Sequence, residues 1–248
     1  MREQKDIKID KIIKSKRKTV MMQITQDARL VVRAPKYTPD FIIKIAVQKR
    51  SEWVQKNQKK MRERVGRVEK KQFQSNEEFL YLGQKYKLYC LSKEEEGNSK
   101  EKFKQDSVLL KKKNQKESLL FDGETFFLMS DVSNPKKEFE DWYKKRASEV
   151  IFLRVKELAL KYNFSYNKIR ITNARTRWGS CSSRKNLNLS WRLIMAPEVV
   201  LDYVILHELS HLREQNHGKE FWFLVEKMCP SYKEQKRWLK NNGCILDV

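Results

Sequence analysis

The sequence predicts an α+β fold, in which a β-rich N-terminal region precedes a region of mixed strands and helices. The 248 residues are 40% hydrophobic and 11% aromatic, a composition that can bury a core. The first half contains short β-prone runs separated by turn residues. Longer segments whose apolar residues recur at helical spacing follow in the second half. Together these patterns indicate a mixed fold.

The first predicted elements are two strands and one long helix. Thr19–Thr25 and Arg29–Ala34 are β-rich runs joined by a short segment, which predicts a hairpin, and Pro35 ends the second strand. The segment Thr38-Pro39-Asp40 supplies a hydroxyl cap, a proline at the first helical position and an acid in the first turn. We expect the helix that starts here to continue to about Arg64.

Further strands are expected before residue 133. Phe79–Leu82 and Lys85–Leu91 flank a Gly-Gln pair and predict a second hairpin. Val108–Leu110 is expected to be a strand, and the turn pair Asp122-Gly123 predicts another hairpin. The charged segment Ser92–Lys104 is expected to be a loop. Residues 1–133 are therefore predicted to form a β-rich region with one long helix.

A second long helix is predicted to begin at Asn134-Pro135 and to end near Tyr162, because Phe139, Trp142, Ile151 and other apolar residues recur there at helical spacing. We place a domain boundary at the start of this helix. Residues 134–248 are then expected to form the second domain.

The second domain is predicted to continue with two strands and a helix. Lys168–Thr172 is a short strand, and in Asn186–Ile194 apolar and polar residues alternate. A period of two predicts a strand with one buried and one polar face. A helix is expected to begin near Ala196 and to continue to about Gln215.

The net charge of +22 indicates a strongly basic surface. The stretch between residues 168 and 192 contains no acidic residue. If its basic side chains share one face, that face would attract nucleic acid or acidic protein substrates. The alternative is that they diverge, or pair with distant acidic residues. The basic residues of this stretch are Lys168, Arg170, Arg175, Arg177, Arg184, Lys185 and Arg192.

The sequence predicts a cytoplasmic protein with no membrane partner. No apolar run approaches the roughly 18 residues that a membrane-spanning helix needs. The segment Met1–Lys18 is rich in Lys and Arg and lacks the apolar core of a secretory signal. The four cysteines, Cys90, Cys181, Cys229 and Cys244, are scattered, so we expect reduced thiols and no cysteine zinc site.

The segment from His207 to His211 is an HExxH motif in a predicted helix. Residues four positions apart lie on one face of a helix, so both imidazoles can bind a single metal ion. The third histidine of the chain, His217, lies ten residues after His207. Catalytic zinc takes three protein ligands and keeps a fourth position open. We therefore expect one zinc ion per chain, held by these three histidines.

Glu208 is the expected catalytic base, because it directly follows the first ligand. Zinc lowers the pKa of its bound water to about 7 and polarises a carbonyl, and Glu208 would take the water proton and pass it to the leaving amine. Glu214 lies on the same helical face as His211, where it could support a ligand by a hydrogen bond or compete as third ligand. We favour support. Either Asn216 or Gly218 is expected to make the turn that directs His217 inward.

The group that stabilises the tetrahedral oxyanion is left open between four residues: Tyr203, Arg177, Tyr232 and Asn216. Arg177 and Trp178 belong to a segment of charged, aromatic, glycine and hydroxyl residues, which we expect to border the active-site cleft. The strand Asn186–Ile194 that follows is either an edge strand, which could pair with an extended substrate, or an interior strand of its sheet.

Three segments of the C-terminal half resemble those of the YgjP-like metallopeptidases, a bacterial zincin family. They are Arg177-Trp178-Gly179-Ser180-Cys181, His207-Glu208-Leu209-Ser210-His211 and Asn216-His217-Gly218-Lys219-Glu220-Phe221-Trp222. The resemblance is strong over about residues 140–243 and weaker before them. It implies a zincin-like catalytic fold, three histidine ligands and peptidase activity on an unnamed polypeptide. The family is also similar to the SprT-like proteases, a link by analogy only.

The sequence thus predicts a zinc-dependent metallopeptidase. Two alternative functions belong to other functional classes. One is a nucleic-acid-associated protein with a structural zinc site, against which Glu208 argues, since a structural site needs no base. The other is a zinc hydrolase that acts on a non-peptide amide.

Overall fold

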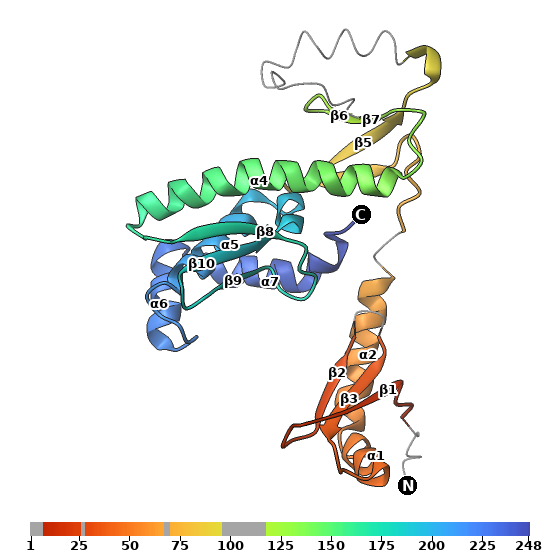
Figure 1. Ribbon diagram of the computed structural model, residues 1–248, viewed down its shortest axis with the longest axis vertical. Coiled ribbons are helices and arrows are strands. Elements are labelled where there is room, and N and C mark those ends of the chain that lie inside the picture. The colour runs from red at the N-terminus through yellow and green to blue at the C-terminus, as the bar shows by residue number, and fades with distance from the viewer. Residues whose placement is uncertain (1–6, 26–27, 67–69, 96–117) are drawn as a thin grey trace. The chain divides into compact units, whose positions relative to one another are not determined.

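A computed structural model of the protein describes residues 7–25, 28–66, 70–95 and 118–248. The chain divides into two compact units, Met1–Glu69 and Lys70–Val248 (Figure 1). The boundary expected at residue 133 falls inside the second unit.

The first unit is a three-stranded sheet with two helices. Its strands are β1 (Lys11–Ser15), β2 (Met21–Ile24) and β3 (Leu30–Pro35), and β3 lies centrally, parallel to β1 and antiparallel to β2. The predicted pairing of the second and third strands is confirmed. The first strand, with two isoleucines among lysines, was not predicted.

The helix predicted up to Arg64 is two helices, α1 (Asp40–Gln48) and α2 (Ser51–Val65). The expectation of one continuous helix is therefore wrong. The break places the apolar residues of both helices in one core with β3. That core consists of Leu30, Val32, Ala34, Ile43, Val47 and Val54.

The second unit begins with a four-stranded sheet in the order β4-β5-β7-β6. The strands are β4 (Glu78–Tyr81), β5 (Gln84–Cys90), β6 (Leu119–Phe121) and β7 (Thr125–Leu128). Both predicted hairpins are present, β4 with β5 and β6 with β7, while β5 and β7 run parallel. The strand expected at Val108–Leu110 lies outside the described residues.

The long helix α4 (Pro135–Lys161) joins this sheet to the rest of the second unit (Figure 1). The helix begins where the sequence predicts, and the Asn134 side chain caps it by accepting a hydrogen bond from the Lys137 N–H at 3.2 Å. One end of α4 buries Phe139 and Tyr143, and the other buries Val155 and Leu158. Because one continuous core extends along the helix, residues on either side of position 133 form a single unit.

A second, three-stranded sheet has the order β8-β10-β9. β8 (Lys168–Thr172) is parallel and β9 (Gly179–Cys181) antiparallel to the central β10 (Asn186–Ser190). The strand predicted up to Ile194 ends at Ser190, because the next five residues form a fully buried 3-10 helix, η1 (Trp191–Met195). The sheet order makes β10 the interior strand, which is the second of the two alternatives that the sequence left open.

Three helices complete the second unit: α5 (Glu198–Ser210), α6 (Lys219–Met228) and α7 (Tyr232–Asn242), followed by the short η2 (Gly243–Ile245). Both α6 and α7 pack against α5. The predicted α+β class is confirmed. Within the described ranges, none of the helices combines the length and hydrophobicity that crossing a bilayer requires.

Candidate metal centre and cleft

The three histidines of the chain converge at the end of α5. His207 lies in the last turn of the helix, His211 caps it, and His217 lies in the segment before α6. One ring nitrogen from each histidine lies within 4.8 Å of the others. His207 Nε2 and His217 Nε2 are 3.0 Å apart. This cluster could bind a metal ion.

Neighbouring groups orient the imidazoles. His211 Nδ1 lies 3.1 Å from the backbone carbonyl oxygen of Glu214, which suits a tautomer that donates from Nδ1 and leaves Nε2 free for a metal. The buried Phe221 ring of α6 packs against all three imidazoles, with centroid separations of 4.9, 4.6 and 4.7 Å. Packing and one backbone hydrogen bond thus hold the cluster together.

Burial and neighbouring charges favour the neutral forms of His207 and His217. Burial, and then the nearby His211 and His217, lower the pKa of His207 to about 3. Burial also lowers the pKa of His217, and His211 and Lys236 add to the shift. Neutral imidazoles are the form that binds metals. The lowered pKa values of His207 and His217 favour the form of these two rings that can bind a metal ion.

Glu208 lies beside the cluster, 5% exposed, between α5 and β9. Burial raises the pKa of its carboxyl group to about 7, against the opposing effect of the Arg177 charge. Its Oε2 atom is buried without a hydrogen-bond partner among the described residues. A Cβ atom at Gly179 would lie only 2.5 Å from Glu208 Oε1, so this approach needs glycine.

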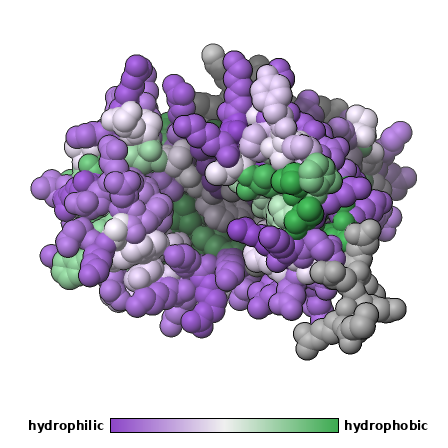
Figure 2. Space-filling model, turned by 90° about the horizontal axis from the view of Figure 1, so that it is seen from below, coloured by the Kyte–Doolittle hydropathy of each residue, from purple (hydrophilic) through white to green (hydrophobic). Residues whose placement is uncertain are grey.

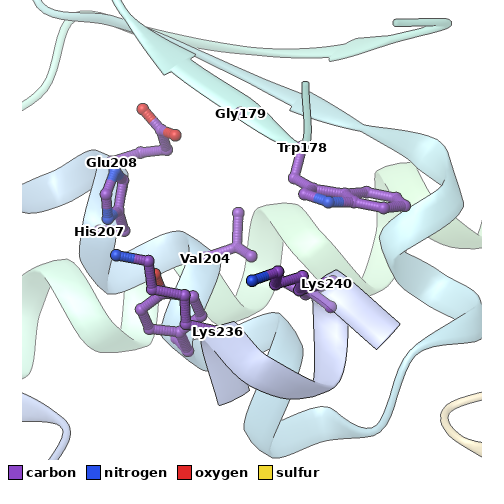
Figure 3. Close-up of a pocket in the computed structure, with 9 residues that line it drawn as sticks. Trp178, Gly179, Val204, His207, Glu208, Lys236 and Lys240 are labelled. Carbon is purple, nitrogen blue, oxygen red and sulfur yellow. The ribbon is translucent and has the colours of Figure 1, made fainter. Parts of the chain in front are cut away.

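Two cavities meet at Gly179, His207 and Glu208. The first cavity, of about 340 Å³, lies towards Trp178 and α7 (Figure 3). The second cavity, of about 380 Å³, lies towards Arg177 and the end of β9. Together they form a cleft on both sides of the histidine cluster.

The free edge of β9 borders this cleft. β9 pairs only with β10 among the described strands, and the Ser190 N–H donates to the Trp178 carbonyl oxygen at 2.8 Å. Hydrogen-bonding direction alternates along an antiparallel strand. The N–H and C=O groups of Gly179 and Cys181 therefore point away from β10, where another strand could pair with them.

The structure brings most of the predicted site residues to the cleft. Arg177 lines the second cavity and Trp178 the first. Tyr203 also lines the first cavity, with its ring centroid 5.9 Å from that of His207, and burial raises the pKa of its hydroxyl to about 12. The Glu214 side chain is exposed, and its contact with His211 is made by its backbone. Asn216 lines neither cavity.

Two lysines that line the first cavity, Lys236 and Lys240, were missed by sequence analysis. They lie four residues apart on α7. This helix is rich in lysine, arginine and asparagine, a composition typical of a solvent-exposed segment. Their spacing places them on one helical face, but only the packing of α7 on α5 brings that face to the cluster.

The basic stretch between residues 168 and 192 does not form one uniform face. Arg192 is 3% exposed, and both it and Arg175 pair with Asp247, at 3.0 and 3.5 Å. Arg177 points its charge towards the cleft. Figure 2 shows one face of the molecule on which hydrophilic residues predominate. This arrangement does not support nucleic-acid binding.

Two solved structures are similar to part of this chain. The metallopeptidase zymogen of Pyrococcus abyssi abylysin is 22% identical over 36% of this chain and 92% of its own, with a TM-score of 0.34. The metallopeptidase zymogen of Methanocaldococcus jannaschii jannalysin is 26% identical over 35% of this chain and 93% of its own, with a TM-score of 0.31. No curated protein matches the chain significantly. The family model of the YgjP-like metallopeptidase domain matches residues 18–242, and the chain therefore belongs to the YgjP-like metallopeptidase family.

Proposed function

We propose that this protein is a zinc-dependent peptidase that hydrolyses peptide bonds with Glu208 as general base. The observation that carries the proposal is the position of Glu208. Its buried carboxyl group lies beside the histidine cluster and against the free edge of β9, where an extended peptide would be held. A structural metal site would need neither the carboxylate nor the adjacent cleft.

The metal ligands in this proposal are His207, His211 and His217, with one zinc ion per chain. Zinc, when bound, would supply a Lewis acid for water activation and carbonyl polarisation. The support is chemical: three neutral imidazoles are a common ligand set of catalytic zinc. The hydrogen bond between His211 and the Glu214 carbonyl oxygen would keep one ligand in its binding tautomer.

Glu208 would take the proton of the attacking water and deliver it to the leaving amine. A general base works best when its pKa lies near the working pH. In the metal-free protein, burial raises the pKa of Glu208 to about 7, so a proton on this carboxyl group is not strongly disfavoured near neutrality. Arg177, which lines the same cleft, is the residue we propose to stabilise negative charge on the carbonyl oxygen.

β9 would hold the substrate by strand addition. The outward N–H and C=O groups of Gly179 and Cys181 can pair with a peptide backbone. We propose an antiparallel orientation, which is slightly more stable per residue than a parallel one. The substrate would then be a polypeptide in an extended conformation. We further propose a cytoplasmic location, which the four unpaired thiols favour.

The proposal is tested by comparing the wild-type protein with Glu208→Gln. Both are incubated with a proteome-derived peptide library, and the products are identified by mass spectrometry. We expect cleavage by the wild type alone, with equal zinc content in both proteins. Equal cleavage by both would exclude Glu208 as the base. Hydrolysis of small amides without any peptide cleavage would favour the non-peptide alternative.

A further inference from the structure

The first cavity contains two positively charged groups that the proposed chemistry does not use. Lys236 and Lys240 extend from α7 and line this cavity, with the ammonium group of Lys236 on the side of His207 (Figure 3). Their spacing of four residues places both on one face of the helix. Among the described residues, neither ammonium forms an ion pair with a carboxylate. The cavity therefore holds a local excess of positive charge beside the metal centre.

Lys236 is held near the cluster by an aromatic stack. Its Nζ lies 4.2 Å from the centroid of the Trp222 ring, and Trp222 stacks on Tyr232 with a centroid separation of 5.3 Å. Lys236 lines the same cavity as His207 and Glu208, so its charge lies beside the cluster.

The rest of the cavity suits the stem of a substrate side chain. Trp178, Val204 and Leu239 provide apolar walls, and Glu208 is the one acidic residue in the lining. An aliphatic stem could pack on these walls while its end group meets the ammonium groups. A carboxylate is the end group in peptides that matches two cations.

The direction of β9 assigns the cavity to one side of the cleaved bond. The cavity lies at Trp178 and Gly179, where β9 begins, whereas the second cavity extends to Ser182 beyond its end. An antiparallel peptide has its C-terminal part beside the start of β9. The first cavity would therefore receive residues that follow the cleaved bond.

We propose that Lys236 and Lys240 form a subsite for a carboxylate on the C-terminal side of the cleaved bond, supplied by an Asp or Glu side chain or by the free C-terminus of a peptide. This inference rests on the proposed peptidase function. Such a subsite would give the enzyme a preference for substrates with an acidic residue after the cleaved bond, or for bonds near the C-terminus of a peptide.

The test uses zinc-loaded full-length protein and fluorogenic peptides that carry Glu, Gln or Lys at each of the two positions after the cleaved bond. Each peptide is made with a free and an amidated C-terminus, which separates the two sources of the carboxylate. We expect kcat/KM to be roughly fivefold higher for the carboxylate-bearing peptides, an effect of the size measured for exposed charge pairs. The preference should shrink as salt rises.

In the variant Lys236→Met/Lys240→Met, the ratio of kcat/KM for Glu peptides to kcat/KM for Gln peptides should fall from roughly five to about one. Methionine keeps the length and apolar stem of the side chain without its charge. The matched control is Arg237→Met, which removes an exposed cation from the same helix outside the cavity lining and should leave the preference intact. Lys236→Gln/Lys240→Gln, with melting temperatures for all variants, separates loss of charge from misfolding.

Binding of labelled hexapeptides to Glu208→Gln, measured by fluorescence anisotropy, gives a readout that needs no turnover. Roughly fivefold tighter binding of Glu than of Gln peptides, lost in the lysine variants, supports the subsite. Equal binding of Glu and Gln peptides would overturn it, as would a preference confined to positions before the cleaved bond. If no peptide is cleaved by the wild type, the peptidase proposal fails while this binding result still decides the subsite.

Discussion

Replacing Gly179 by alanine should disable catalysis with little effect on stability. The added Cβ would lie 2.5, 2.6 and 2.7 Å from Oε1, Cγ and Cδ of Glu208. An ordinary van der Waals contact starts near 3.4 Å, so the carboxyl group must move by about 0.9 Å. A misplacement of about 1 Å at a catalytic group can reduce the rate by about 100-fold. We therefore expect kcat/KM to fall roughly 100-fold.

The stability effect should be small because the obstructing atoms are the end of a side chain that can rotate. Overpacking costs about 1–3 kcal/mol in a rigid core, and we expect the lower end of that range here. The assay combines kcat/KM, zinc content and the unfolding midpoint. Gly218→Ala is the matched control, since an added Cβ there has no atom within 4 Å. A Gly179→Ala enzyme within threefold of wild-type kcat/KM would refute the assigned position of the base.

Three further changes test separate parts of the site and core. His217→Ala removes the proposed third ligand and should lower zinc affinity by about 10-fold or more, whereas Glu214→Ala should retain the affinity because the backbone of Glu214 makes the contact with His211. Zinc affinity is measured by equilibrium dialysis, and a loss of affinity in Glu214→Ala but not in His217→Ala would make Glu214 the ligand. Arg177→Met should lower kcat by roughly 10-fold or more with little change in KM; a pure KM effect would limit Arg177 to substrate binding. Tyr143→Phe removes the hydrogen bond that the Tyr143 hydroxyl donates to the Leu80 carbonyl oxygen at 2.6 Å. Urea titration should show a free energy of unfolding that is lower by about 1–2 kcal/mol, with kcat unchanged.

Local patterns predicted the elements that depend on neighbouring residues. The hairpin at Asp122-Gly123 and the capped start of α4 at Asn134 follow from turn and capping chemistry, which acts within a few residues. The pairing of His207 with His211 follows from helical spacing alone. These features could be predicted because their causes lie within one segment.

The features that sequence analysis missed depend on tertiary packing. The alternation in residues 186–194 is compatible with a longer strand, but burial of all of η1 ends the strand at Ser190. Sheet order, which makes β9 the edge, is set by contacts between distant segments. The position of Lys236 beside the cluster likewise depends on how α7 packs against α5. Charge and periodicity carry no information on such placements.

The central claim, a zinc-dependent peptidase, is tested most directly by titrating the metal-free protein with zinc while peptide cleavage is measured. We expect no cleavage without metal, and a rise that saturates at about one zinc ion per chain, the stoichiometry of a catalytic site with three protein ligands. Cleavage that persists after complete metal removal, or a zinc-saturated protein that cleaves no peptide, would contradict the account.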